Sequence, residues 1–65
     1  MIVRPVGDDG SGEPARRVDV DGSPVGHAHS ASDVTEFMRR ADLDAALIDD
    51  PGIVEWQGGG PDVWE

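Results

Sequence analysis

Residues 15–41, ARRVDVDGSPVGHAHSASDVTEFMRRA, contain the pattern that decides the fold of this chain. Apolar and polar residues alternate over residues 17–20, which is typical of a strand with one buried face. Asp21-Gly22 follows as a strong turn dipeptide, and the alternation resumes after it. Residues 15–29 are therefore predicted to form a β-hairpin.

The length of the hairpin loop decides which residues share a face. Pro24 cannot donate a hydrogen bond to a neighbouring strand, which favours a four-residue loop over residues 21–24. Residues that face each other across a ladder point their side chains to the same side of the sheet. An even loop then places His27 and His29 on the face of the valines of the first hairpin strand.

The end of the same stretch predicts a helix over residues 33–41. Ser30 and Ser32 offer two N-caps in succession, and Arg39-Arg40 lie at the end where the helix dipole favours cations. Apolar residues follow the i, i+3, i+4, i+7 spacing of one buried face, namely Val34, Phe37, Met38 and Ala41. We expect Phe37 to be the centre of this face.

The segments on either side complete a sheet. Residues 1–6 form a β-branched run that ends in a loop rich in glycine and acids, and we expect an edge strand there. Residues 53–57 form a further strand after a Pro-Gly turn. The order β, β-hairpin, α, β predicts an α+β fold with a mostly antiparallel sheet of three or four strands and one principal helix on a face. A chain of 65 residues is expected to form a single domain over 1–65.

The charge of the chain is unevenly distributed. Residues 1–40 hold seven acids and five arginines, whereas residues 41–65 hold seven acids and no base, and the net charge is −9. Nucleic acids and anionic membranes attract proteins of the opposite sign, so neither is expected as a partner. The field is compatible with a basic protein partner, but an acidic surface also serves solubility alone, and a homodimer contact would help so small a core.

Four aspartates of the acidic half and two tryptophans are the candidate binding residues. The aspartates flank turns and a short helical segment over 45–48, where we expect them to cap and to remain solvated. Three consecutive glycines allow the chain to turn back, so that the second tryptophan packs near the first. The six candidates are Asp42, Asp44, Asp49, Asp50, Trp56 and Trp64. They predict a non-enzymatic accessory protein that binds another macromolecule.

His27 and His29 carry the alternative function, a small metal- or ligand-binding module. Strand residues two apart point the same way and offer two imidazoles to one metal, with Asp19, Asp21 or Asp33 as a third ligand. The absence of cysteine excludes a thiolate zinc site and a cysteine nucleophile. The serines that follow are needed as helix caps, so we expect no enzyme and no cofactor.

The composition also indicates a source and a compartment. Lysine, asparagine and tyrosine are missing and every cation is arginine, which is typical of a very high-GC genome. No apolar run suggests a signal-peptide core or a membrane span, so a cytoplasmic protein is expected. The Val-Asp-Gly hairpin, the DVTEFMRR helix and the closing GGGPDVWE resemble small uncharacterised acidic proteins of actinobacteria such as streptomycetes. This resemblance implies a folded chain and no particular activity or site residue.

Overall fold

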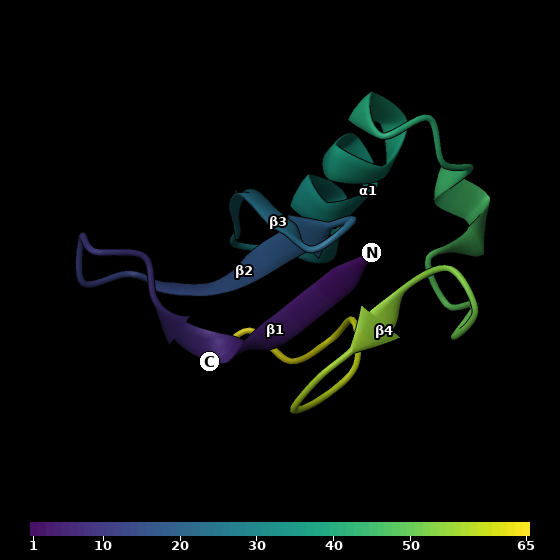
Figure 1. Cartoon of the computed structure of the whole chain (residues 1–65). Helices are drawn as coiled ribbons and strands as arrows, with labels where there is room; N and C mark the ends of the chain where they lie inside the picture. Colours follow the sequence, from purple (N-terminus) through teal and green to yellow (C-terminus); the bar gives the residue numbers. More distant parts are fainter.

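The computed structural model describes all 65 residues and contains one sheet and one α-helix (Figure 1). The α+β class and the order strand, hairpin, helix, strand are confirmed. The elements are β1 (Ile2–Asp8), β2 (Pro14–Val20), β3 (Ser23–Ala28), α1 (Ala31–Arg40), the 3₁₀ turn η1 (Ala45–Leu47) and β4 (Glu55–Trp56). No helix has both the length and the apolar character needed to span a membrane.

The sheet has the strand order β3-β2-β1-β4. Both pairs on the hairpin side are antiparallel, whereas β4 runs parallel to β1, so the sheet is mixed and mostly antiparallel. The expectation that the first strand lies at an edge is wrong, because β4 pairs with its Ile2 and Val3. Pro5 is tolerated in this inner strand because it lies in a bulge between Val3 and Val6, beyond the end of β4.

The hairpin loop is shorter than the predicted four residues. Val20 pairs with Ser23, and the two loop residues Asp21 and Gly22 have φ angles of 52° and 80°, as a type I′ turn requires. Pro24 enters the ladder without serious loss because β3 is an outer strand and its register shifts at this point.

This register shift also changes the faces of the histidines. One residue of β3 is inserted between the pairs Val18 with Gly26 and Asp19 with Pro24. His27 consequently pairs with Arg17 and lies on the side of the sheet opposite Val18. The predicted face shared by the histidines and the valines is therefore wrong.

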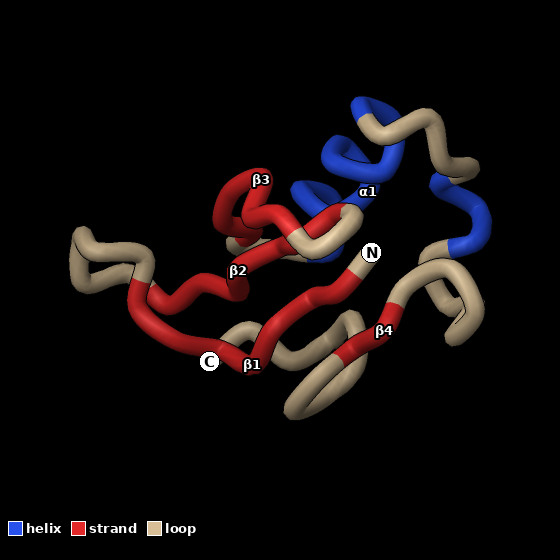
Figure 2. The backbone as a smooth tube through the Cα atoms, viewed as in Figure 1, coloured by secondary structure: helices blue, strands red, loops and turns tan.

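Helix α1 begins two residues earlier than predicted, because Ser30 is the N-cap that the chain uses. Its Oγ accepts a hydrogen bond from the Asp33 amide at 3.4 Å. The helix packs on one face of the sheet, near β2 and β3, and the connection through η1 carries the chain to β4 (Figure 2). The fully buried core between these layers comprises Val3, Val18, Ala28, Val34, Met38 and Val54.

Phe37 is only partly buried and is not the centre of the helix's buried face. Its ring lies over Gly26 of the outer strand β3, where an added Cβ would be 2.7 Å from the ring. The sheet ends at this strand, so no further layer covers the ring. Val34 and Met38, both fully buried, form the centre instead.

Candidate functional site

The four candidate aspartates, Asp42, Asp44, Asp49 and Asp50, all lie on the connection between α1 and β4. We call residues 42–50 the acidic segment. Each of the four side chains belongs to an exposed residue, and none forms an ion pair. The carboxylates are thus open to solvent, in agreement with their predicted roles as caps and turn formers.

The backbone of the acidic segment is held in place at several points. Asp42 adopts a left-handed conformation with φ of 63° that ends the helix. Asp44 caps η1 by accepting the Ala46 amide at 2.9 Å. The Trp56 indole donates to the Ile48 carbonyl at 2.9 Å and ties the segment to β4. The four carboxylates therefore project from a defined backbone.

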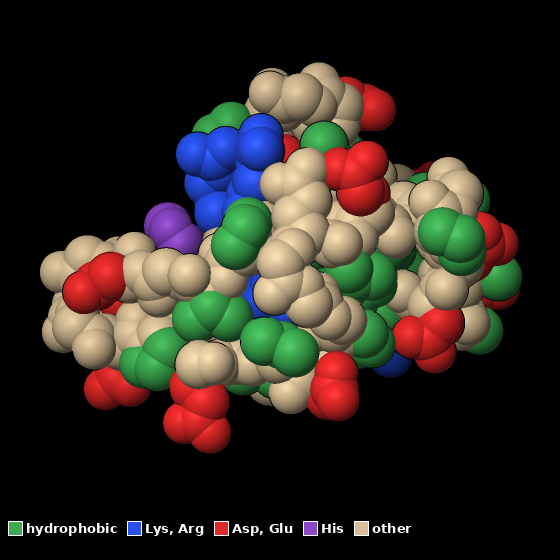
Figure 3. All heavy atoms as spheres, turned by 90° about the horizontal axis from the view of Figure 1, so that it is seen from below, with side chains coloured by type: hydrophobic (Ala, Val, Ile, Leu, Met, Phe, Trp, Pro, Cys, Tyr) green, Lys and Arg blue, Asp and Glu red, His purple; other side chains and the backbone are tan.

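No arginine of the chain neutralises this segment. Arg4 and Arg17 pair with Asp19, and Arg39 pairs with Glu36 on the same helix. Figure 3 shows one face of the molecule, where basic side chains gather in one area beside a histidine and acidic side chains lie toward the rim. The carboxylates of the acidic segment therefore have no cationic partner within the chain.

The two candidate tryptophans form an edge-to-face pair, as the predicted return of the tail requires. The centroids of Trp56 and Trp64 are 6.3 Å apart, and their planes are 89° apart. Both indole N–H groups donate within the chain, that of Trp64 to the Pro61 carbonyl at 2.6 Å. Their polar atoms are therefore already used by the protein itself.

A fully buried arginine, Arg16, lies against both indoles. Its guanidinium carbon is 5.1 Å from the Trp56 ring centroid and 5.5 Å from that of Trp64. Its five N–H groups donate to five backbone carbonyls at 2.8–3.0 Å, those of Arg4, Gln57, Gly59, Gly60 and Val63. Burial lowers the pKa of this guanidinium. The arginine fastens the C-terminal segment, residues 57–64, to the sheet and uses every donor it has.

Sequence reasoning missed this cluster although one signal was present. Arg16 alternates with Val18 and Val20, so the period of two already places it on their buried face. Its acceptors come from the triple-glycine region, which must bend sharply: Gly59 has φ of 133°, and an added Cβ would lie 2.8 Å from Val63. The tryptophans are therefore mainly structural partners of Arg16.

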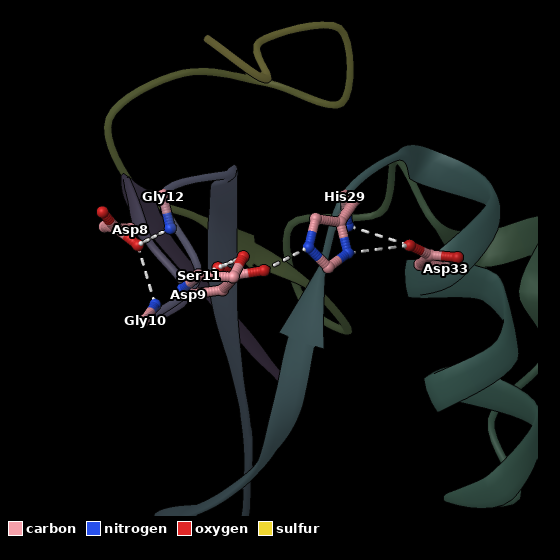
Figure 4. A network of polar contacts seen from close by, with 7 residues as sticks. All are labelled: Asp8, Asp9, Gly10, Ser11, Gly12, His29 and Asp33. Atoms are coloured by element: carbon pink, nitrogen blue, oxygen red, sulfur yellow. Dashed lines mark hydrogen bonds and ion pairs between the residues drawn. The ribbon is translucent and has the colours of Figure 1, made fainter.

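His29 links the β1–β2 loop to the start of α1 (Figure 4). Its Nε2 lies 2.7 Å from Asp9 Oδ2, and its Nδ1 lies 3.7 Å from Asp33 Oδ2. Hydrogen bonds from Ser11 and then from His29 lower the pKa of Asp9, while the bond to Asp9 raises the pKa of His29. The imidazole acts as a polar bridge between two carboxylates.

His27 and His29 have different surroundings and do not converge. His27 belongs to the ladder opposite Arg17, whereas His29 lies beyond the end of β3 and engages Asp9. No group of three histidine, cysteine, aspartate or glutamate side chains is placed to hold a metal ion. The geometry therefore gives the alternative metal module no ligand set.

Asp19, one of the aspartates considered as a third ligand, is buried beneath two arginines. Arg4 Nη2 and Arg17 Nε lie 2.9 and 3.0 Å from its carboxylate oxygens. The hydrogen bond from Arg17 is the main cause that lowers the pKa of this carboxyl group. The cluster joins β1 to β2 on the side of the sheet opposite α1.

No family model, no curated protein and no solved structure matches this chain.

Proposed function

We propose that this chain is a non-enzymatic cytoplasmic accessory protein that binds a basic protein through the acidic segment, residues 42–50. The observation that carries the proposal is the combination of four exposed, unpaired carboxylates with a backbone fixed by η1 and by the Trp56 hydrogen bond. A fixed cluster of like charge attracts an oppositely charged surface at long range and limits the orientations in which it can dock.

The distribution of the other polar groups supports a binding role over catalysis. The carboxyl groups whose pKa is shifted, Asp9 and Asp19, spend their oxygens on hydrogen bonds and ion pairs within the chain. Two hollows lie on the surface, and neither brings a serine or threonine nucleophile next to a base. Nucleophilic catalysis by serine or threonine needs such a pair, oriented in a shielded pocket.

The test compares two variants that have lost the same number of charges. The first changes Asp42, Asp44, Asp49 and Asp50 to asparagine, which keeps the oxygens that accept the Ala46 and Gly52 amides. The matched control neutralises four exposed acids outside the segment, Glu13, Asp21, Asp62 and Glu65, as the corresponding amides. A partner isolated with the parent chain from a high-GC actinobacterium is then measured against all three proteins.

The segment variant is expected to associate at least about tenfold more slowly, while the control changes by about twofold or less at 0.15 M salt. Equal slowing of both variants would mean that net charge alone acts. Unchanged association of the segment variant would remove the segment from the interface. A partner that instead responds to Trp64→Ala and ignores salt would indicate an apolar contact through Trp56 and Trp64.

A further inference from the structure

A second surface feature lies between the β2–β3 hairpin and the C-terminal end of α1, next to the start of the acidic segment. It is a hollow of about 300 Å³ lined by Val20, Val25, Phe37, Ala41 and Arg40. Four of the five lining residues are apolar, and Val25 leaves 47% of its surface exposed. Pockets that bind small molecules begin at about this volume and are lined mainly by apolar side chains.

The floor of this hollow is formed by a contact between α1 and β3. The Phe37 ring rests on Gly26, because only a residue without a Cβ leaves room for it on β3. Val20 and Val25 come from the two strands of the hairpin, on either side of its turn. Val25 is the extra residue at the register shift of β3. The hairpin therefore supplies one wall of the hollow, and α1 supplies the other.

Arg40 is the single charged residue of the lining, and it has no carboxylate partner. Its guanidinium carbon lies 5.6 Å from the centroid of the Phe37 ring, where it is oriented by the aromatic face. The preceding Arg39 is paired with Glu36 at 3.0 Å, so the acid one helical turn before Arg40 is already engaged. The Arg40 guanidinium therefore keeps its charge and its N–H donors available to an anion at the edge of the hollow.

We propose that this hollow binds a small amphipathic carboxylate, whose apolar body covers the valines and Phe37 and whose carboxylate pairs with Arg40. The occupant is a free small molecule. At about 30 Å³ for each water-sized group, the hollow of about 300 Å³ holds on the order of ten non-hydrogen atoms. A second hollow of about 220 Å³ adjoins at Arg40 and Phe37, but Asp33 and Glu36 line it. These acids repel an anion, so the carboxylate stops at Arg40.

The test uses sodium octanoate, which has ten non-hydrogen atoms, added to the full chain and followed by ¹H–¹⁵N NMR. The salt concentration is 0.15 M, at which repulsion by distant acids is screened beyond about 8 Å. Octanoate should shift the amides of Val20, Val25, Phe37, Arg40 and Ala41 in a saturable way. The expected dissociation constant is about 0.1–1 mM for a ligand of this size in an open site.

Two controls separate a charged pocket from general apolar adhesion. Arg40→Gln should weaken octanoate binding about fivefold or more, whereas Arg17→Gln, with the same change of net charge at a half-exposed arginine that pairs with Asp19, should change it by less than about twofold. Octanol, which has the same number of carbons and no charge, should bind the parent about as weakly as octanoate binds the Arg40 variant. Val25→Ser should weaken both ligands.

Three results would overturn the proposal. These are an absence of saturable shifts at the lining residues, equal effects of the two arginine substitutions, and octanol binding as tight as octanoate binding. Arg40 is exposed, so its variant should keep the dispersed spectrum of the parent, which the same experiment records.

Discussion

Replacement of Arg16 by lysine tests how the C-terminal segment is held. The variant keeps the charge and removes the planar fork, because an ammonium group has three donors where the guanidinium has five. At least two of the five carbonyls that Arg16 now satisfies must lose their partner. Each unsatisfied buried acceptor costs about 1–3 kcal/mol, so the free energy of unfolding should fall by about 2–6 kcal/mol.

This loss is a large part of the free energy of unfolding of an ordinary domain, which is about 5–15 kcal/mol. Urea denaturation is followed by circular dichroism for the sheet and by the fluorescence of Trp56 and Trp64 for the C-terminal segment. Arg17→Lys is the control, because this arginine is 46% exposed and its pair with Asp19 should contribute about 1 kcal/mol or less. The reasoning is refuted if Arg16→Lys unfolds within about 1 kcal/mol of the parent.

Three further substitutions have expected outcomes. Gly59→Ala places a side chain at φ of 133° and against the side chain of Val63. It should lower the free energy of unfolding, measured by urea titration, by about 1–3 kcal/mol. An unchanged free energy of unfolding would contradict the bend of the C-terminal segment at Gly59. Met38→Ala removes a fully buried side chain and should cost about 2–5 kcal/mol, more than Phe37→Ala, and the reverse order would restore Phe37 as the centre. His29→Gln should destabilise the chain more at pH 5 than at pH 9: Asp9 raises the pKa of His29, so its contribution is complete below the ordinary value of about 6.5 and disappears as the pH rises through the folded pKa. Melting temperatures of the parent and the variant between pH 5 and pH 9 test this expectation. A larger destabilisation at pH 9 would contradict it.

Local patterns in the sequence were enough to predict the fold class. The hairpin turn and the helix caps depend on neighbouring residues, so the Asp21-Gly22 turn was predicted and Ser30 was one of two predicted caps, although the predicted loop was two residues too long and the predicted helix began two residues late. The extra residue in β3 could not, because a bulge breaks the period of two at a single position. That one residue reversed the face of His27. The parallel pairing of β4 depends on contacts between distant parts of the chain.

The same difference between local patterns and distant contacts applies to the candidate residues. The exposure of Asp42, Asp44, Asp49 and Asp50 follows from their places in turns, which the sequence already indicates. The five carbonyls around Arg16 come from residues 4 and 57–63, so no local pattern could bring them together. The partners of the other arginines likewise depend on the register of the sheet. These contacts decide which acids are left unpaired.

A charge exchange across the interface tests the binding role of the acidic segment most directly. Once the basic partner is isolated, Asp49→Arg is combined with an Arg→Asp or Lys→Asp change at each basic position of the partner's binding surface in turn. We predict that each single change weakens binding by about tenfold and that one combination recovers most of the loss, since close charge pairs couple by about 1.5 kcal/mol or more. Losses that simply add in every combination would contradict contact between the acidic segment and the partner.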